Sequence, residues 1–130
     1  MSLTLQPAIA RLAFFIAAVA VLVIANLPDP PQLPGELSDK QQHFLAFAVL
    51  TLLARPAWPT AAAWELLISL GAFGALIEFA QAGAGYGRDP SLADWLADCL
   101  AVVLVLALFF AIRLVIRRGK PAEADPDSQR

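Results

Sequence analysis

The stretch 8-AIARLAFFIAAVAVLVIANL-27 decides the class of this protein. It contains a single charged side chain, Arg11. About 20 apolar residues in an α-helix are enough to cross the ~30 Å hydrocarbon core of a bilayer. A secretory signal peptide is the alternative, with Arg11 as its charged region and residues 12–25 as its core. Residues 24–27 (IANL) form a poor small-residue cleavage site, so we expect this segment to be retained as a membrane span.

The composition agrees with a membrane protein. Of the 130 residues, 59% are apolar and 15% are charged, against roughly 45–50% and about 25% in soluble domains. So little polar surface argues against a soluble enzyme. A net charge of −2 gives no basic face for a nucleic-acid partner. The single cysteine, Cys99, excludes an internal disulfide and a cysteine-rich zinc site, and we expect it to be a small packing residue.

Three further apolar stretches lie at 38–54, 61–82 and 92–112. Ser38 and Gln41 match a capping box, and Ser91 with Asp94 repeats the pattern, so a helix is expected to begin at each serine. Thr60 is expected to cap the third of the four stretches. The prolines between residues 28 and 34 and between 56 and 59 are expected to end helices. The sequence thus predicts an all-α antiparallel bundle of four transmembrane helices over residues 1–118, followed by a disordered tail at 119–130.

Basic residues set the expected orientation, because loops on the cytoplasmic side carry an excess of lysine and arginine. With both termini in the cytoplasm, seven basic residues fall inside and two fall outside. The inner set is Arg11, Arg55, Arg113, Arg117, Arg118, Lys120 and Arg130, and the outer set is Lys40 and Arg88. The loops 28–37 and 83–90 are therefore expected on the outer side.

Polar residues converge at that outer side. Asp39 and His43, Glu78 and Gln81, and Asp94 and Asp98 form three pairs at helical spacing, so each helix presents its pair on one face. A lone charge costs about 2.5–3.5 kcal/mol at the bilayer centre, which favours mutual pairing. We therefore predict an outward-facing polar pocket. Its predicted ligand-binding residues are Asp39, Lys40, His43, Glu78, Gln81, Arg88, Asp94 and Asp98.

Plainer roles compete with this interpretation. Asp94 suits any helix start, Arg88 can pin its loop by pairing with Asp94 or Asp98, and Lys40 can extend to the interface. Glu65 is explained by an ion pair with Arg55 or by its place in a first helical turn. His43 and Glu78 interrupt apolar segments where neutral residues insert more easily, so they carry the functional interpretation. We predict no cofactor and no metal, since no H-E-x-x-H spacing occurs.

The polar residues also form a recognisable series. Asp39-Lys40-x-x-His43-Phe44-x-x-Phe47, Glu78-x-x-Gln81 and Arg88-x-x-Ser91-x-x-Asp94 follow one another. This series resembles the VanZ-like family over residues 26–112. Its members are bacterial membrane proteins, and the founding example is associated with low-level resistance to the glycopeptide teicoplanin. The resemblance implies a multi-pass protein of the bacterial inner membrane with a role in the cell envelope.

The chain departs from that family in the fourth apolar stretch. Asp98 and Ala101 stand where the family usually has asparagine and glycine. The acid adds a possible negative charge, and the loss of the glycine can loosen a close contact between helices.

Three functions follow as expectations. The first is binding of a lipid-linked, amphiphilic or glycopeptide-type envelope molecule, with membrane lipids as partners and a role in antibiotic tolerance. The second is a membrane-embedded enzyme, whose catalytic candidates are His43, Glu78 and Asp94, with His43 as the base oriented by either carboxylate. Ser91 is a conceivable nucleophile, although its cap role explains it better. The third is transport, for which the inner half of the bundle offers only Glu65.

Overall fold

The computed structural model describes residues 5–29, 31, 37–85 and 90–118. This part of the chain is all-helical, as predicted. Its four helices are α1 (Leu5–Ala25), α2 (Asp39–Ala57), α3 (Ala63–Gly83) and α4 (Leu92–Arg118). Three of them, α1, α3 and α4, are long and apolar enough to cross a membrane. The predicted tail at 119–130 lies outside the described residues, as do most of the two loops assigned to the outer side.

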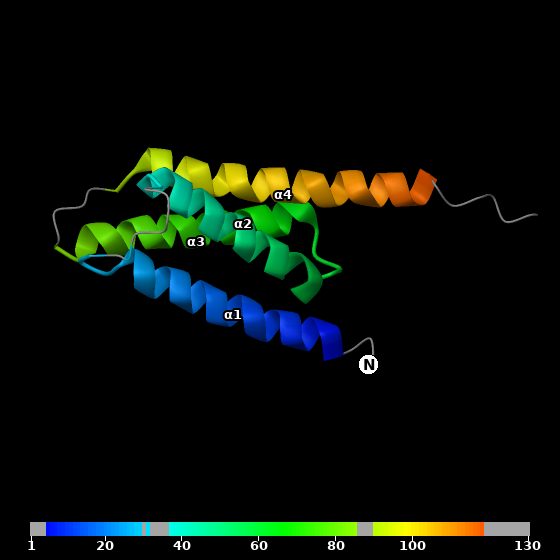
Figure 1. The fold of residues 1–130 in the computed structure, drawn as a ribbon, viewed down its shortest axis with the longest axis horizontal. Helices are drawn as coiled ribbons and strands as arrows, with labels where there is room; N and C mark the ends of the chain where they lie inside the picture. Colours follow the sequence, from blue (N-terminus) through cyan, green and yellow to red (C-terminus); the bar gives the residue numbers. More distant parts are fainter. Residues whose placement is uncertain (1–4, 30, 32–36, 86–89, 119–130) are drawn as a thin grey trace, which may run out of the picture.

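Helices that follow one another in the sequence run antiparallel, whereas α2 and α4, which pack against each other, run parallel (Figure 1). The end of α1, the start of α2, the end of α3 and the start of α4 lie together, and we call this the His43 end. The start of α1, the end of α2 and the start of α3 lie at the other end, here called the Arg11 end. α2 packs against both α1 and α4, while α1 touches α3 only slightly. α2 thus lies between α1 and α4, while α3 packs mainly against α4.

The capping box predicted at the start of α2 is confirmed. The Gln41 amide donates to Ser38 Oγ, and the Ser38 amide donates to Gln41 Oε1 at 2.9 Å. The helix runs to Ala57, three residues beyond its predicted end, with Pro56 in its last turn. Proline is tolerated there because the Trp58 amide still closes the turn on Ala54 O at 3.0 Å. Its 19 residues span about 28 Å at ~1.5 Å per residue.

The predicted cap at Thr60 is wrong. α3 begins two residues later, and its N-cap is Ala62, whose amide donates to Glu65 Oε2 at 2.7 Å. The Glu65 carboxylate reaches back to the free amide at the helix start, which is the favoured place for a negative charge. Arg55 donates instead to the carbonyl oxygens of Ala61 and Pro59. Both side chains therefore shape the short turn between α2 and α3.

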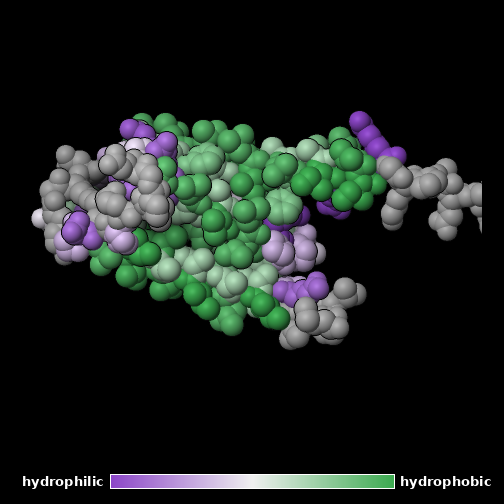
Figure 2. All heavy atoms as spheres, viewed as in Figure 1, coloured by the Kyte–Doolittle hydropathy of each residue, from purple (hydrophilic) through white to green (hydrophobic). Residues whose placement is uncertain are grey.

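The core lies along one stripe of α2. Its buried residues are His43, Phe47, Leu50, Thr51, Ala54 and Ala57. They pack with buried side chains of α3 and α4, among them Ile77 and Val102. Most other large apolar side chains face outward, and Figure 2 shows a continuous apolar surface between the polar groups at the two ends. An apolar surface of this extent is typical of contact with lipid.

α4 continues six residues beyond its predicted end at residue 112, to Arg118. Its 27 residues measure about 40 Å at ~1.5 Å per residue, which exceeds the ~30 Å hydrocarbon core. The excess carries Arg113, Arg117 and Arg118 past the other helices at the Arg11 end (Figure 1). These charges complement the negative end of the helix dipole.

Candidate functional site

His43 and Asp98 form the centre of the polar cluster. His43 Nδ1 lies 3.1 Å from Asp98 Oδ1, which joins α2 to α4. Asp98 is completely buried, and His43 is 8% exposed. The carboxylate that contacts the imidazole is thus Asp98, whereas the sequence prediction paired His43 with Glu78 or Asp94. Both of those are buried nearby, but neither makes a hydrogen bond with the ring in the described structure.

Glu78 connects the imidazole to the start of α4. Its Oε1 lies 3.9 Å from His43 Nδ1, and its Oε2 accepts a hydrogen bond of 2.6 Å from the Ser91 amide. The capping box predicted at Ser91 is therefore half formed. The Asp94 amide does donate to Ser91 Oγ, at 3.2 Å. The Ser91 amide, which Asp94 was expected to bind, is bound by Glu78 from α3.

Three buried carboxyl oxygens have no hydrogen-bond partner among the described residues: Glu78 Oε1, Asp94 Oδ1 and Asp98 Oδ2. Within the described ranges, His43 is the only base that pairs with Glu78 and Asp98. Unpaired carboxylates are costly away from water. These three oxygens are therefore available to bind protons or to accept hydrogen bonds.

Gly74 of α3 makes room for Asp98. A Cβ atom at Gly74 would lie 2.7 Å from Asp98 Oδ2 and 3.4 Å from the Phe47 ring. One turn away, the Trp95 indole donates to Gly71 O at 2.9 Å, and Cys99 Sγ faces the same glycine. Sequence analysis missed these two glycines, although their spacing of three places both on one face of the helix. Ala101, at the position of the expected family glycine, is fully buried.

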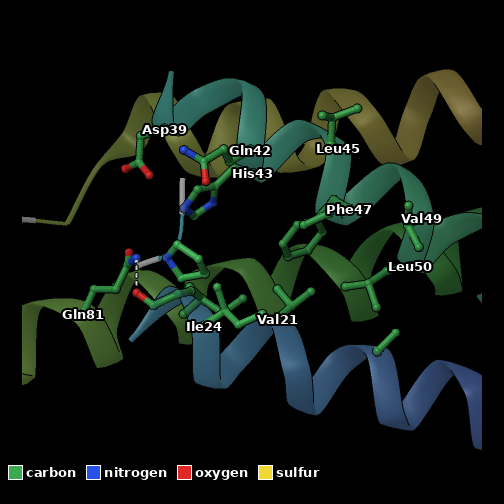
Figure 3. A pocket seen from close by; sticks show the side chains of 15 residues that line it. Val21, Ile24, Asp39, Gln42, His43, Leu45, Phe47, Val49, Leu50 and Gln81 are labelled. Carbon is green, nitrogen blue, oxygen red and sulfur yellow. Dashed lines mark hydrogen bonds between the residues drawn. The ribbon is translucent and has the colours of Figure 1, made fainter. Parts of the chain in front are cut away.

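A groove between α1 and α2 leads to the cluster. Its volume is about 350 Å³. Apolar side chains line its length, among them Val21, Leu45, Val49 and Ile77, and Asp39, Gln42, His43 and Gln81 gather at one end (Figure 3). We call this the α1–α2 groove. It has the shape and polarity of a site for an amphiphile, with an apolar trough that ends at a small polar patch.

The predicted ligand-binding residues separate into three groups. Asp39, His43 and Gln81 line the α1–α2 groove. Glu78, Asp94 and Asp98 lie buried beside the imidazole or near it. Lys40 is exposed and lines a separate depression with Phe44 and Ala97. Arg88 lies outside the described residues. Gln42, which the sequence prediction omitted, belongs with the first group because it also lines the groove. It lies one turn before Ala46, another lining residue, on the same face of α2.

Within the described part of the chain, no three His, Cys, Asp or Glu side chains are arranged to hold a metal ion. The groove and the cluster offer an imidazole held by a carboxylate, with amide and carboxylate oxygens around it. Comparison with models of protein families, with curated proteins and with solved structures finds no match.

Proposed function

We propose that this chain is a VanZ-like protein of the bacterial inner membrane with four spans and both termini in the cytoplasm. The excess of lysine and arginine at the Arg11 end supports this orientation, because such residues mark cytoplasmic loops. The predicted inner residues Arg11, Arg55 and Arg118 all belong to helix segments at that end. In this orientation the His43 end faces the periplasm. α2 completes the four spans, with Asp39 and Lys40 of its first turn exposed at the membrane surface and His43, one turn further on, buried in the bundle.

In this proposal the protein binds an amphiphilic or lipid-linked envelope molecule in the α1–α2 groove. The observation that carries the proposal is the polarity of the groove, which is apolar along its length and polar at the His43 end. A chain in the trough contacts hydrocarbon on the protein and in the bilayer, while the head group reaches the polar patch at the membrane surface. By holding such a molecule the protein acts in cell-envelope function or in tolerance of glycopeptide and lipoglycopeptide antibiotics.

A pair of matched variants tests this function. Ala46 lines the groove, and Ala75 lines a depression on the other side, between α3 and α4. Both are half-buried alanines on the bundle surface. Ala46→Trp should fill the groove and reproduce the envelope-stress profile of a deletion strain, measured as survival under lipoglycopeptides. Ala75→Trp should behave as the unmodified protein. If the deletion strain survives lipoglycopeptides as well as its parent does, the proposed role in tolerance is contradicted.

The contact between His43 and Asp98 favours a second candidate, an enzyme acting on a lipid-linked substrate. A carboxylate that accepts a hydrogen bond from Nδ1 leaves Nε2 as the basic nitrogen, and this is how a general base is oriented. Asp98 takes the orienting role that the sequence prediction gave to Glu78 or Asp94. Turnover of a lipid-linked substrate by the purified protein, lost in His43→Gln, would support this candidate. Binding without turnover supports the first function alone.

A further inference from the structure

The polar end of the α1–α2 groove offers several hydrogen-bond acceptors. Gln42 Nε2 donates to Leu37 O at 3.1 Å, and Gln81 Nε2 donates to Ala25 O at 2.9 Å. Because a carbonyl oxygen can only accept, these bonds fix which way each amide lies. Each bond engages one N–H of the amide with the backbone, which leaves the Oε1 atom as an acceptor beside the second N–H.

His43 adds an acceptor of the same kind. Its Nδ1 is occupied by Asp98 Oδ1 at 3.1 Å, so Nδ1 carries the ring proton when that oxygen accepts. Nε2 then carries the free lone pair of an imidazole that forms part of the groove lining. Asp39, which is exposed in the first turn of α2, adds a carboxylate at the same end (Figure 3).

The charge around this end is negative. The described lining residues of the groove include Asp39 but no lysine or arginine. Behind the imidazole lie the buried acids Glu78 and Asp98, while Lys40 lines a different depression. A phosphate or carboxylate head group would meet acceptors and like charge there, whereas a protonated amine would meet partners for both its hydrogens and its charge.

We propose that the occupant of the α1–α2 groove is an amphiphile with a single hydrocarbon chain and a protonated amine in its head group. This inference rests on the proposed function, because it names the chemical class of the molecule bound there. The volume of about 350 Å³ supports a single chain, since it lies at the lower limit of the range of roughly 300–1,000 Å³ for small-molecule sites. The ammonium group lies against Asp39 and donates hydrogen bonds to His43 Nε2 and Gln81 Oε1.

Native mass spectrometry of the full chain, released from a nonionic detergent, tests the proposal with three probes of equal chain length. The probes are hexadecylamine, hexadecanol and hexadecyl phosphate, at a pH where the amine is protonated. We expect hexadecylamine to bind about tenfold more tightly than hexadecanol, the ratio typical of a hydrogen bond to a charged group. Hexadecyl phosphate should bind most weakly. Equal binding of the three probes, or a preference for the phosphate, would overturn the inference.

Variants locate the preference. Asp39→Asn should reduce the advantage of the amine over the alcohol by about two- to fivefold, as expected for an exposed charge pair. The matched control is Asp29→Asn, which removes an exposed carboxylate near the end of α1 that does not line the groove. An advantage unchanged in Asp39→Asn, or reduced equally in the control, contradicts the placement of the ammonium group.

The outcomes for the two proposals are distinguishable. If Ala46→Trp abolishes binding of all three probes while Ala75→Trp does not, the groove binds amphiphiles and only the head-group preference remains to be decided by the ratios. If Ala46→Trp leaves every probe bound as before, the groove is not the site and the proposed function fails with it.

Discussion

His43 Nδ1 and Asp98 Oδ1 lie 3.1 Å apart in the interior of the bundle and join α2 to α4. The second oxygen of Asp98 has no partner in the described structure and lies against the backbone of Gly74. A single side chain thus holds the imidazole and fills the close contact between α3 and α4.

Removing the Asp98 carboxyl group should destabilise the protein because it leaves the imidazole N–H without its partner. We expect Asp98→Ala to lower the free energy of unfolding by about 1–3 kcal/mol. Asp98→Asn should lose less, since its amide oxygen can still accept from Nδ1. Unfolding in detergent, followed by circular dichroism, measures both. Equal losses in the two variants would show that the contact with His43 contributes little.

Gly74 should not accept a methyl group. A Cβ atom there would lie 2.7 Å from Asp98 Oδ2, so Gly74→Ala must push α4 away from α3 or displace the carboxyl group. The expected cost is about 1–3 kcal/mol. Gly83→Ala is the control, because nothing lies within 4 Å of a Cβ atom at that position near the end of the same helix. Thermal unfolding of the two variants should therefore differ clearly, and a stable Gly74→Ala would contradict the close approach.

Glu78 should slow hydrogen exchange at the start of α4. Its carboxylate binds the Ser91 amide at 2.6 Å, so Glu78→Ala should speed hydrogen exchange in the first turn of α4. Glu65→Ala is a matched control, because Glu65 binds the Ala62 amide in the same way at the other end of α3. Its effect should be confined to that end. Hydrogen–deuterium exchange by mass spectrometry distinguishes the two, and faster exchange around Ser91 in both variants would exclude the specific role of Glu78.

The proposed orientation predicts which ends of the helices reach the periplasm. In a Cys99→Ser background, Asp29→Cys should react with a membrane-impermeant maleimide in spheroplasts, because it lies at the His43 end. Arg118→Cys should react only after the membrane is opened. Labelling of Arg118→Cys alone in closed spheroplasts would indicate the opposite orientation. Labelling of both positions would contradict the proposed topology, and with it the outward-facing pocket.

The sequence by itself determined the helices and the class of the protein. Length and hydropathy are local properties, and the capping box at Ser38 and Gln41 depends on neighbours three residues apart, so α2 begins where it was predicted. Helical spacing also placed Glu78 with Gln81, and Asp94 with Asp98, on shared buried faces. The placement of each pair on one face could therefore be predicted without knowing how the other helices pack.

Only the tertiary structure decided which acid holds the imidazole and where a ligand can enter. Asp94 and Asp98 share a face of α4, so spacing could not choose between them. The choice depends on the offset of α2 along α4, which places His43 Nδ1 3.1 Å from Asp98 Oδ1. In the same way, Lys40 and His43 are three residues apart, yet the packing of α1 beside α2 leaves only His43 in the groove. The rotation of each helix about its axis and its offset along it arise from contacts between distant residues, which no local pattern records.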